Sequence, residues 1–187
     1  MKALPQLLFA LAAVAAFAIA QPANANLITN PGFEQGFTGW QTVSGSFIVG
    51  GTINGVASHS GIRHMALAGA STLSQSVAVT SGTTYTIDFF AATSNVTSPF
   101  TLTVNFGGTV FSHLFTANTG YSEFTFNATP LGSSTNLSFV TTGAGFFALH
   151  LDDISVVPAG VPDGGSTVSL LGCALLGLGA SRRKLSC

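Results

Sequence analysis

Apolar and polar residues alternate in short runs through the middle of the chain. The runs 85–89 and 102–106 carry large apolar residues at every second position, and 77–79, 124–126 and 137–139 repeat the pattern. Alternation over a few residues is typical of strands with one buried face. No stretch of this region keeps a helical period. The pattern therefore predicts an all-β domain.

Turn-forming residues separate these runs. The separators include Ser81-Gly82, Gly107-Gly108 and Gly132-Ser133-Ser134, which are typical of tight connections between strands. Short strands at a spacing of roughly ten residues are typical of two-layered β-folds. The predicted fold is an antiparallel β-sandwich or jelly roll.

The alternation changes phase near the end of this region. Odd positions are apolar over 147–151, whereas even positions are apolar over 154–156. The change falls on Asp152 and Asp153. It predicts a β-bulge or a strand end there, because one extra residue exchanges the two faces of a strand.

The N-terminal end has the features of an export signal. Lys2 is the only charge before an apolar run over 7–20, and Ala23-Asn24-Ala25 follows. A basic start, an apolar stretch and an A-x-A site predict a secretory signal helix that is removed by signal peptidase. We expect cleavage before Asn26, with Gln21 as the second choice. The alternative is an N-terminal membrane anchor.

The C-terminal end has three parts in a fixed order. Val161-Pro162-Asp163-Gly164-Gly165 comes first, then an apolar run over 168–180, then Arg182-Arg183-Lys184. The run predicts a short apolar helix, below the ~20 residues that comfortably span a bilayer. The basic cluster would hold its end in the cytoplasm.

This layout resembles the PEP-CTERM sorting signals, in the variant that begins Val-Pro-Asp-Ser-Gly, with Gly164 here in place of serine. The resemblance implies recognition by an exosortase, cleavage near the motif and a link to exopolysaccharide. It also implies a Gram-negative-type bacterium, in which the chain is held transiently in the inner membrane and then reaches the cell surface or extracellular matrix. A plain C-terminal membrane anchor is the alternative, and a GPI signal fits the basic end poorly.

These features divide the chain into four parts. They are a signal peptide (1–25), a β-sandwich domain (26–158), a linker with the sorting motif (159–165) and a hydrophobic sorting helix with a basic tail (166–187). Both cysteines, Cys173 and Cys187, lie in the last part. The mature domain therefore has no disulfide, and a core or a bound ion must stabilise it.

The charge of the middle domain excludes one class of partner. Residues 26–158 contain one strong base, Arg63, and five acids, which gives a net charge of 1 − 5 = −4. Nucleic-acid binding needs a basic surface that neutralises phosphates. We therefore expect no nucleic-acid partner.

The two ends of the middle domain resemble those of the galactose-binding-like jelly rolls, which include carbohydrate-binding modules. The resemblance rests on the stretch 26–34, on Gly39-Trp40 and on the stretch 151–156. It implies a structural Ca²⁺ where the first and last strands meet, held by Glu34, by Asp152 or Asp153, and by backbone carbonyls. Such hard oxygen ligands suit calcium. Asp152 is favoured over Asp153 as the ligand because it has the same parity as the apolar residue Ile154. The alternative is that these acids cap loops or face solvent.

Sugar-binding modules commonly stack exposed aromatic rings on sugars. Trp40 and Tyr85 lie in patterns that predict a core position, whereas Tyr121 follows Gly120 in an expected turn. Tyr121 is therefore the candidate ligand-binding residue.

We find no catalytic constellation. The histidines are not spaced as metal ligands, there is no G-x-S-x-G motif, and nothing brings the remaining acids Asp88 and Glu123 together. The predicted function is that of a non-enzymatic, exported protein with a structural or adhesive role in the exopolysaccharide layer. The alternative is a carbohydrate-binding module that recognises a specific glycan, and a hydrolase of matrix polymers is a third possibility.

Overall fold

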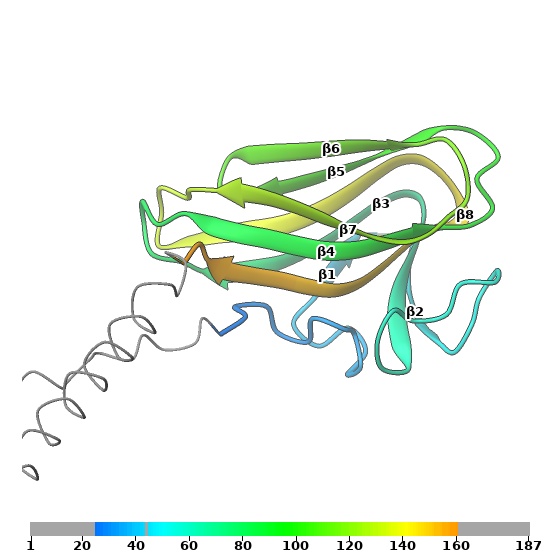
Figure 1. Ribbon diagram of the computed structural model, residues 1–187, viewed down its shortest axis with the longest axis horizontal. Helices are drawn as coiled ribbons and strands as arrows, with labels where there is room; N and C mark the ends of the chain where they lie inside the picture. The colour runs from blue at the N-terminus through cyan, green and yellow to red at the C-terminus, as the bar shows by residue number, and fades with distance from the viewer. Residues whose placement is uncertain (1–24, 44, 161–187) are drawn as a thin grey trace, which may run out of the picture. The chain divides into compact units, whose positions relative to one another are not determined.

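The alternating runs form antiparallel strands. The computed structural model describes residues 25–43 and 45–160, and it contains no α-helix within them (Figure 1). The strands are β1 (Gln41–Val43), β2 (Ser46–Gly50), β3 (Arg63–Ala78), β4 (Tyr85–Thr93), β5 (Phe100–Phe106), β6 (Thr109–Phe115), β7 (Thr119–Ala128) and β8 (Ser134–Pro158). The predicted signal helix, C-terminal helix and sorting motif lie outside these residues. Within the described ranges, no helix could cross a membrane.

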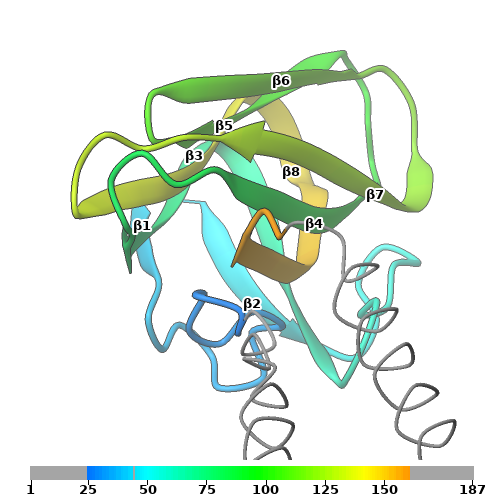
Figure 2. The ribbon, with the colours of Figure 1, turned by 60° about the vertical axis from the view of Figure 1, so that its left-hand side comes forward.

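The long strands β3 and β8 connect two layers. The β5 layer has the strand order β1-β3-β8-β5-β6, and the β4 layer continues from β8 through β4 to β7. β2 pairs with the first residues of β3. Figure 1 shows β8 in yellow in the upper layer, turning at its label and returning in orange in the lower layer. One continuous hydrogen-bonded sheet thus folds over on itself (Figure 2).

Glycines mark the bend in both long strands. Gly69 in β3 has a φ of 66° and Gly143 in β8 has a φ of 75°. The β3–β8 register shifts on either side of Gly69. A positive φ is readily adopted by glycine but is unfavourable for residues with a Cβ. These two positions therefore allow the pair of strands to turn from one layer into the other.

The core lies between the layers and follows the predicted alternation. Every second residue of β4 and β5 is buried there, namely Tyr85, Ile87, Phe89, Phe100, Leu102, Val104 and Phe106. Phe139 of β8 is fully buried and contacts the ring of Phe89 edge-on at 5.2 Å. Residues 25–159 belong to one compact unit around this core.

The two aromatic residues expected in the core are buried as predicted. The ring of Trp40 lies 5.3 Å from that of Phe33, and its indole N–H donates to the carbonyl of Asn30. Tyr85 is the first residue of β4; it is buried, and its ring meets Phe106 edge-on at 6.2 Å. Neither ring is available as an exposed platform.

The predicted bulge is confirmed. Phe90 pairs with Asp152 but Asp88 pairs with Ser155, so β8 contains one residue more than β4 across this step. Asp153 has a φ of 48°. Leu149 and Leu151 before this point, and Ile154 and Val156 after it, are fully buried. The extra residue returns β8 to the core face with the opposite parity.

The first residues run along the last strand, as the resemblance implied. The backbone N–H of Leu27 donates to the carbonyl of Val156 at 2.9 Å. The side chain of Asn26 donates to the carbonyl of Ile154 and accepts from the N–H of Val156. The N-terminal segment therefore closes one side of the β4 layer.

Candidate functional site

An acidic cluster forms where the bulge in β8 meets the 59–63 loop, the segment that leads into β3. Asp152 is fully buried. Its Oδ2 accepts from the backbone N–H of His59 at 2.8 Å and of Ser60 at 3.2 Å, and its Oδ1 accepts from the N–H of Asp153 at 2.9 Å. One buried carboxylate thus satisfies three backbone donors.

Asp153 binds the same loop through side chains. The His59 Nδ1–H donates to its Oδ2 at 2.6 Å, and the Ser60 hydroxyl donates to its Oδ1 at 2.6 Å. The bulge makes this possible, because without the extra residue two successive side chains of a strand point to opposite faces.

Glu34 of the N-terminal segment binds the other end of the loop, at Ile62 and Arg63. Its Oε1 accepts from the backbone N–H of Ile62 at 2.8 Å and of Arg63 at 2.9 Å. Gly61 lies between these contacts with a φ of 59°, and a Cβ there would collide with the Glu34 carboxylate. The loop thus joins the first and last segments of the domain.

We expect Gly61→Ala to destabilise the domain by about 2–3 kcal/mol, because the left-handed backbone costs about 1 kcal/mol and the carboxylate must also move. Urea unfolding measures the loss. Gly82→Ala is the matched control, since Gly82 has a φ of 75° and a Cβ there would have no neighbour within 4 Å. The control should lose only about 1 kcal/mol, and equal losses in both variants would contradict the expected collision with Glu34.

Two aromatic rings enclose His59. The His59 ring stacks on Phe90 with centroids 3.8 Å apart and meets Tyr121 edge-on at 5.3 Å. Tyr121 lies within β7 and is half-buried, so it does not occupy the exposed turn that the sequence predicted. Its hydroxyl is buried without a hydrogen-bond partner among the described residues. Burial and the nearby carboxylates of Asp152 and Asp153 raise the pKa of Tyr121.

The same surroundings change the acidity of Asp152. Burial, followed by the charge of Asp153, raises the pKa of Asp152 to about 6, although its backbone hydrogen bonds act in the opposite direction. The partners of its carboxylate are N–H groups without formal charge. The ionised form of Asp152 is therefore disfavoured in the folded domain.

The structure brings all three predicted calcium ligands, Glu34, Asp152 and Asp153, to one loop. The contacts described above, however, place N–H or O–H donors against their carboxylate oxygens, whereas calcium requires six to eight oxygen ligands. No group of three His, Cys, Asp or Glu side chains in the described part of the chain is arranged to hold a metal. As arranged, this donor set does not fit a calcium ion, and calcium binding stays a prediction.

Sequence reasoning missed a buried row of hydrogen-bonded polar side chains. His64 Nε2 lies 3.0 Å from His150 Nδ1, and His150 Nε2 lies 2.7 Å from the Ser94 hydroxyl. All three side chains are buried, and burial lowers the pKa of His64. The serine–histidine contact resembles part of a catalytic triad, but a buried Ser94 is closed to a substrate. Sequence separations of 86 and 56 residues gave no signal for this contact.

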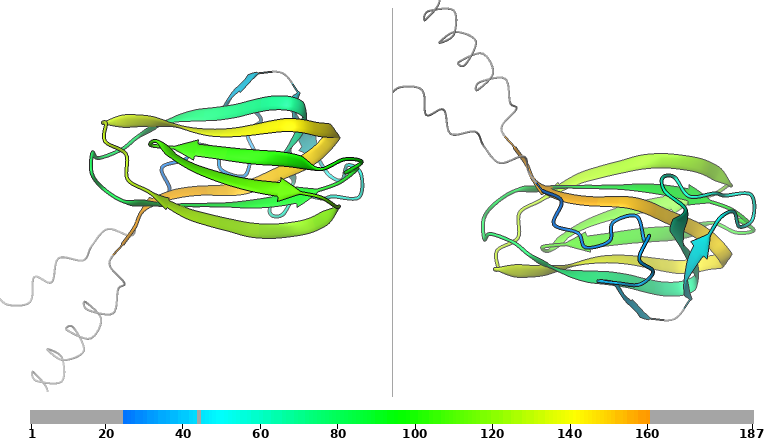
Figure 3. Two further views of the ribbon diagram at one scale, coloured as in Figure 1. Left: turned by 90° about the horizontal axis from the view of Figure 1, so that it is seen from above. Right: turned by 90° about the horizontal axis from the view of Figure 1, so that it is seen from below.

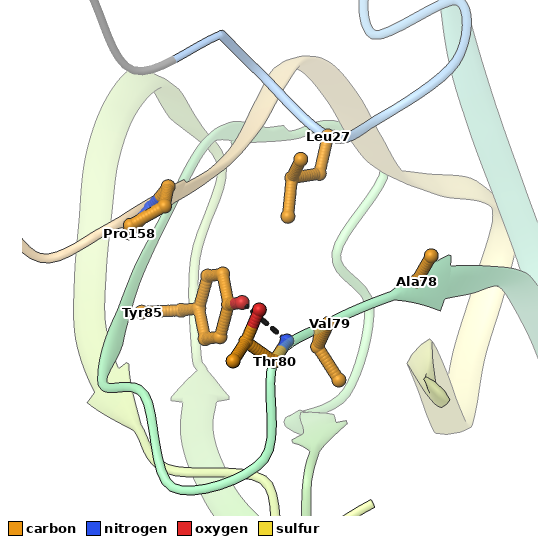
Figure 4. Close-up of a pocket in the computed structure, with 6 residues that line it drawn as sticks. All are labelled: Leu27, Ala78, Val79, Thr80, Tyr85 and Pro158. Carbon is orange, nitrogen blue, oxygen red and sulfur yellow. Dashed lines mark hydrogen bonds between the residues drawn. The ribbon is translucent and has the colours of Figure 1, made fainter. Parts of the chain in front are cut away.

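A pocket of about 320 Å³ is lined by Leu27 of the N-terminal segment and Pro158 at the end of β8 (Figure 4). Ala78, Val79, Thr80 and Tyr85 complete its lining. The Tyr85 hydroxyl already accepts from the Thr80 N–H at 2.8 Å. The lining contains no charged side chain and none of the predicted site residues.

The outer face of the β5 layer is a second candidate surface. Strand pairing places β3, β8, β5 and β6 side by side (Figure 3). Paired residues of neighbouring strands lie on the same face of the layer. We call this surface the hydroxyl face. Its residues are Gln41, Val43, Thr72, Ser74, Ser76, Asn136, Ser138, Val140, Thr142, Thr101, Thr103, Asn105, Val110, Ser112 and Leu114. None of them is charged.

Comparison by sequence identifies the tail. Residues 160–185 match the VPDSG-CTERM motif, which confirms the predicted variant of the sorting signal and indicates a secreted or surface protein. Among curated proteins, none matches the chain.

Comparison by structure identifies the fold of the domain. A family 61 carbohydrate-binding module, solved with β-1,4-galactotriose, is 18% identical with a TM-score of 0.56, over 72% of this chain and 99% of that one. The CBM22-1 xylan-binding domain of Paenibacillus barcinonensis Xyn10C is 19% identical with a TM-score of 0.52, over 76% and 99%. An arabinose-bound GH51 α-L-arabinofuranosidase has a TM-score of 0.59 at 14% identity, over 76% of this chain but 28% of the enzyme. These likenesses confirm the all-β jelly-roll fold.

Proposed function

We propose that this protein is exported and binds neutral polysaccharide at the cell surface through the hydroxyl face. The observation that carries the proposal is an outer surface of five adjacent strands without a charged side chain. In a domain whose net charge is 1 − 5 = −4, the acids lie elsewhere. A neutral polymer can therefore approach this face without the desolvation of any ion.

The chemistry of the hydroxyl face suits sugars. Serine and threonine hydroxyls each donate and accept a hydrogen bond, and asparagine and glutamine amides do both. Sugar hydroxyls have the same dual character. Neighbouring strands repeat at about 4.8 Å and alternate residues along a strand at about 7 Å, so the face offers a regular array of partners to a repeating polymer.

The face also predicts weak binding by each domain. Its apolar positions are aliphatic, at Val43, Val140, Val110 and Leu114, and large aromatic platforms, which supply most contact energy in many interfaces, are absent from it. We infer dissociation constants of about 0.1–1 mM. Such affinities suit a structural or adhesive role in a layer where many copies act together.

The fold and the tail support this proposal from two directions. Similar modules were solved with β-1,4-galactotriose or described as xylan-binding, and several of the similar structures are modules rather than whole enzymes. The sorting motif supports processing by an exosortase at the C-terminal end, and the A-x-A site Ala23-Asn24-Ala25 supports processing by signal peptidase at the other end. The mature domain would then act without catalysis in the exopolysaccharide layer.

Binding to neutral glycans tests the proposal. We expect residues 26–159 to bind one or more neutral polysaccharides in affinity electrophoresis, and Thr103→Glu, which places a charge in the centre of the face, to weaken binding at least about tenfold. Thr97→Glu makes the same change on an exposed loop and should bind as the parent does. Absence of binding to a neutral glycan panel at about 1 mM, or equal binding by both variants, would refute the proposal.

A further inference from the structure

Strand β6 forms an open edge of the β5 layer. It pairs with β5 along its whole length, from Thr109 opposite Phe106 to Phe115 opposite Phe100. Within the described residues, no strand pairs with its other side, and β6 is the uppermost strand in Figures 1 and 2. Its backbone N–H and C=O groups on that side are therefore available to another strand.

This edge lacks the usual protection against pairing. Natural edge strands commonly carry a lysine, a proline or a bulge that prevents association. β6 has no lysine, arginine, acid or proline, and its register with β5 is unbroken. Val110 is 60% exposed and Leu114 is 56% exposed. By contrast β7, the edge of the other layer, carries the exposed acid Glu123.

An aromatic seam lies beside this edge. Phe111 of β6 stacks on Phe126 of β7 at 5.5 Å and meets Phe124 at 5.9 Å. All three rings are only partly buried, although they pack against the core. The two layers are thus open on this side, and large apolar side chains reach solvent there. Exposed apolar surface of this kind marks an association site.

We propose that a second copy of this chain pairs with β6 in antiparallel orientation, with the two-fold axis at Ser112. In that register Val110 faces Leu114 of the second copy, and Leu114 faces its Val110. On the inner side Phe111 faces His113 of the second copy. The sequence of β6 is therefore self-complementary, which a two-fold interface requires because each copy contributes the same surface.

The proposed dimer has a consequence for the surface beside it. Directly opposed residues of an antiparallel pair lie on the same face, so Val110, Ser112 and Leu114 of both copies remain on one side. Two five-stranded layers become one ten-stranded sheet. The two uncharged outer faces then form one continuous surface, whether or not that surface binds sugar.

Charge reversal across the two-fold axis tests the register. We expect residues 26–159 to dimerise in sedimentation equilibrium between about 10 µM and 1 mM. Val110→Lys combined with Leu114→Lys sets like charges opposite each other and should weaken the dimer roughly 100-fold. Val110→Glu combined with Leu114→Lys places each carboxylate opposite an ammonium of the second copy, and should restore a dimer that high salt dissociates.

Controls separate this interface from other modes of association. Leu131→Lys adds one positive charge away from β6, at a residue that is 85% exposed in the loop between β7 and β8, and it should dimerise as the parent does. A parent that stays monomeric at 1 mM overturns the proposal. So does a dimer that survives the double-lysine change, or association that occurs only in the full chain and not in residues 26–159.

Discussion

Asp152→Ala is expected to lower the free energy of unfolding by about 3–5 kcal/mol at pH 7. The carboxylate is fully buried and accepts three backbone N–H groups, two of them from the 59–63 loop. Leaving buried donors without an acceptor costs about 1–3 kcal/mol each, and water that enters the loop recovers part of this. Denaturant unfolding with a constant m-value measures the loss.

The pH dependence of the loss distinguishes the carboxylate from ordinary packing. Burial raises the pKa of Asp152 from 3.8 to about 6. Between pH 3.8 and about pH 6, the folded state therefore holds a proton on Asp152 that the unfolded state has released. The parent should therefore gain up to about 3 kcal/mol from this group as the pH falls from 7 to 4. The difference in unfolding free energy between the parent and the alanine variant should therefore grow over the same pH range. The measurement is made with a chelator present, so that no bound metal contributes.

Asp152→Asn serves as the control for shape. It keeps one carbonyl acceptor and removes the ionisable group, so its deficit should be smaller than that of the alanine variant at every pH. If the loss of unfolding free energy in Asp152→Ala became smaller as the pH falls, the folded domain would favour the ionised form of Asp152. That result would contradict the prediction. Adding calcium to the parent provides a separate comparison, because only an ion held by these acids would raise the melting temperature at micromolar concentrations.

Phe139→Ala should cost about 3–5 kcal/mol, because it removes a fully buried ring from the centre of the sandwich. Phe139 lies on β8 in the β5 layer, and it contacts Phe89 of the β4 layer at 5.2 Å and Trp40 of the N-terminal segment at 6.3 Å. The ring therefore joins three parts of the domain. Thermal unfolding with calorimetric detection measures the change.

Phe139→Leu and Phe37→Ala are the controls for Phe139→Ala. Leucine retains much of the buried volume and should lose about 1–2 kcal/mol. Phe37 is 41% exposed, so its truncation should cost well under 1 kcal/mol. If Phe139→Ala cost no more than Phe37→Ala, Phe139 would not be part of the packed core.

The strands were predictable because parity is a local property. The runs 85–89 and 102–106 are buried on alternate residues as expected, and the change of parity at Asp152 and Asp153 coincides with the observed bulge. The approach of Glu34 to these acids followed from a resemblance at the two ends of the domain. That resemblance did not reveal the donors on the 59–63 loop, because backbone N–H groups have no sequence signature.

The remaining features depend on which strands become neighbours. The hydroxyl face combines residues from five strands, and the order of β8 between β3 and β5 cannot be obtained from alternation alone. The chain of His64, His150 and Ser94 depends on the same long-range order. Tyr121 was expected in a turn because of Gly120, but β7 begins at Thr119, and Tyr121 lies within this strand where its register with β4 shifts.

The passage of β8 through both layers determines how the domain would bear a mechanical load. A pull at the C-terminal end enters at Pro158 and runs directly into β8, which is hydrogen-bonded to β4 on one side and, farther along, to β3 and β5. A force along a strand acts on many hydrogen bonds at once in shear, instead of opening them one after another. If the C-terminal end is the point of attachment to the cell, tension from the surrounding polymer would be shared between both layers before any strand could detach.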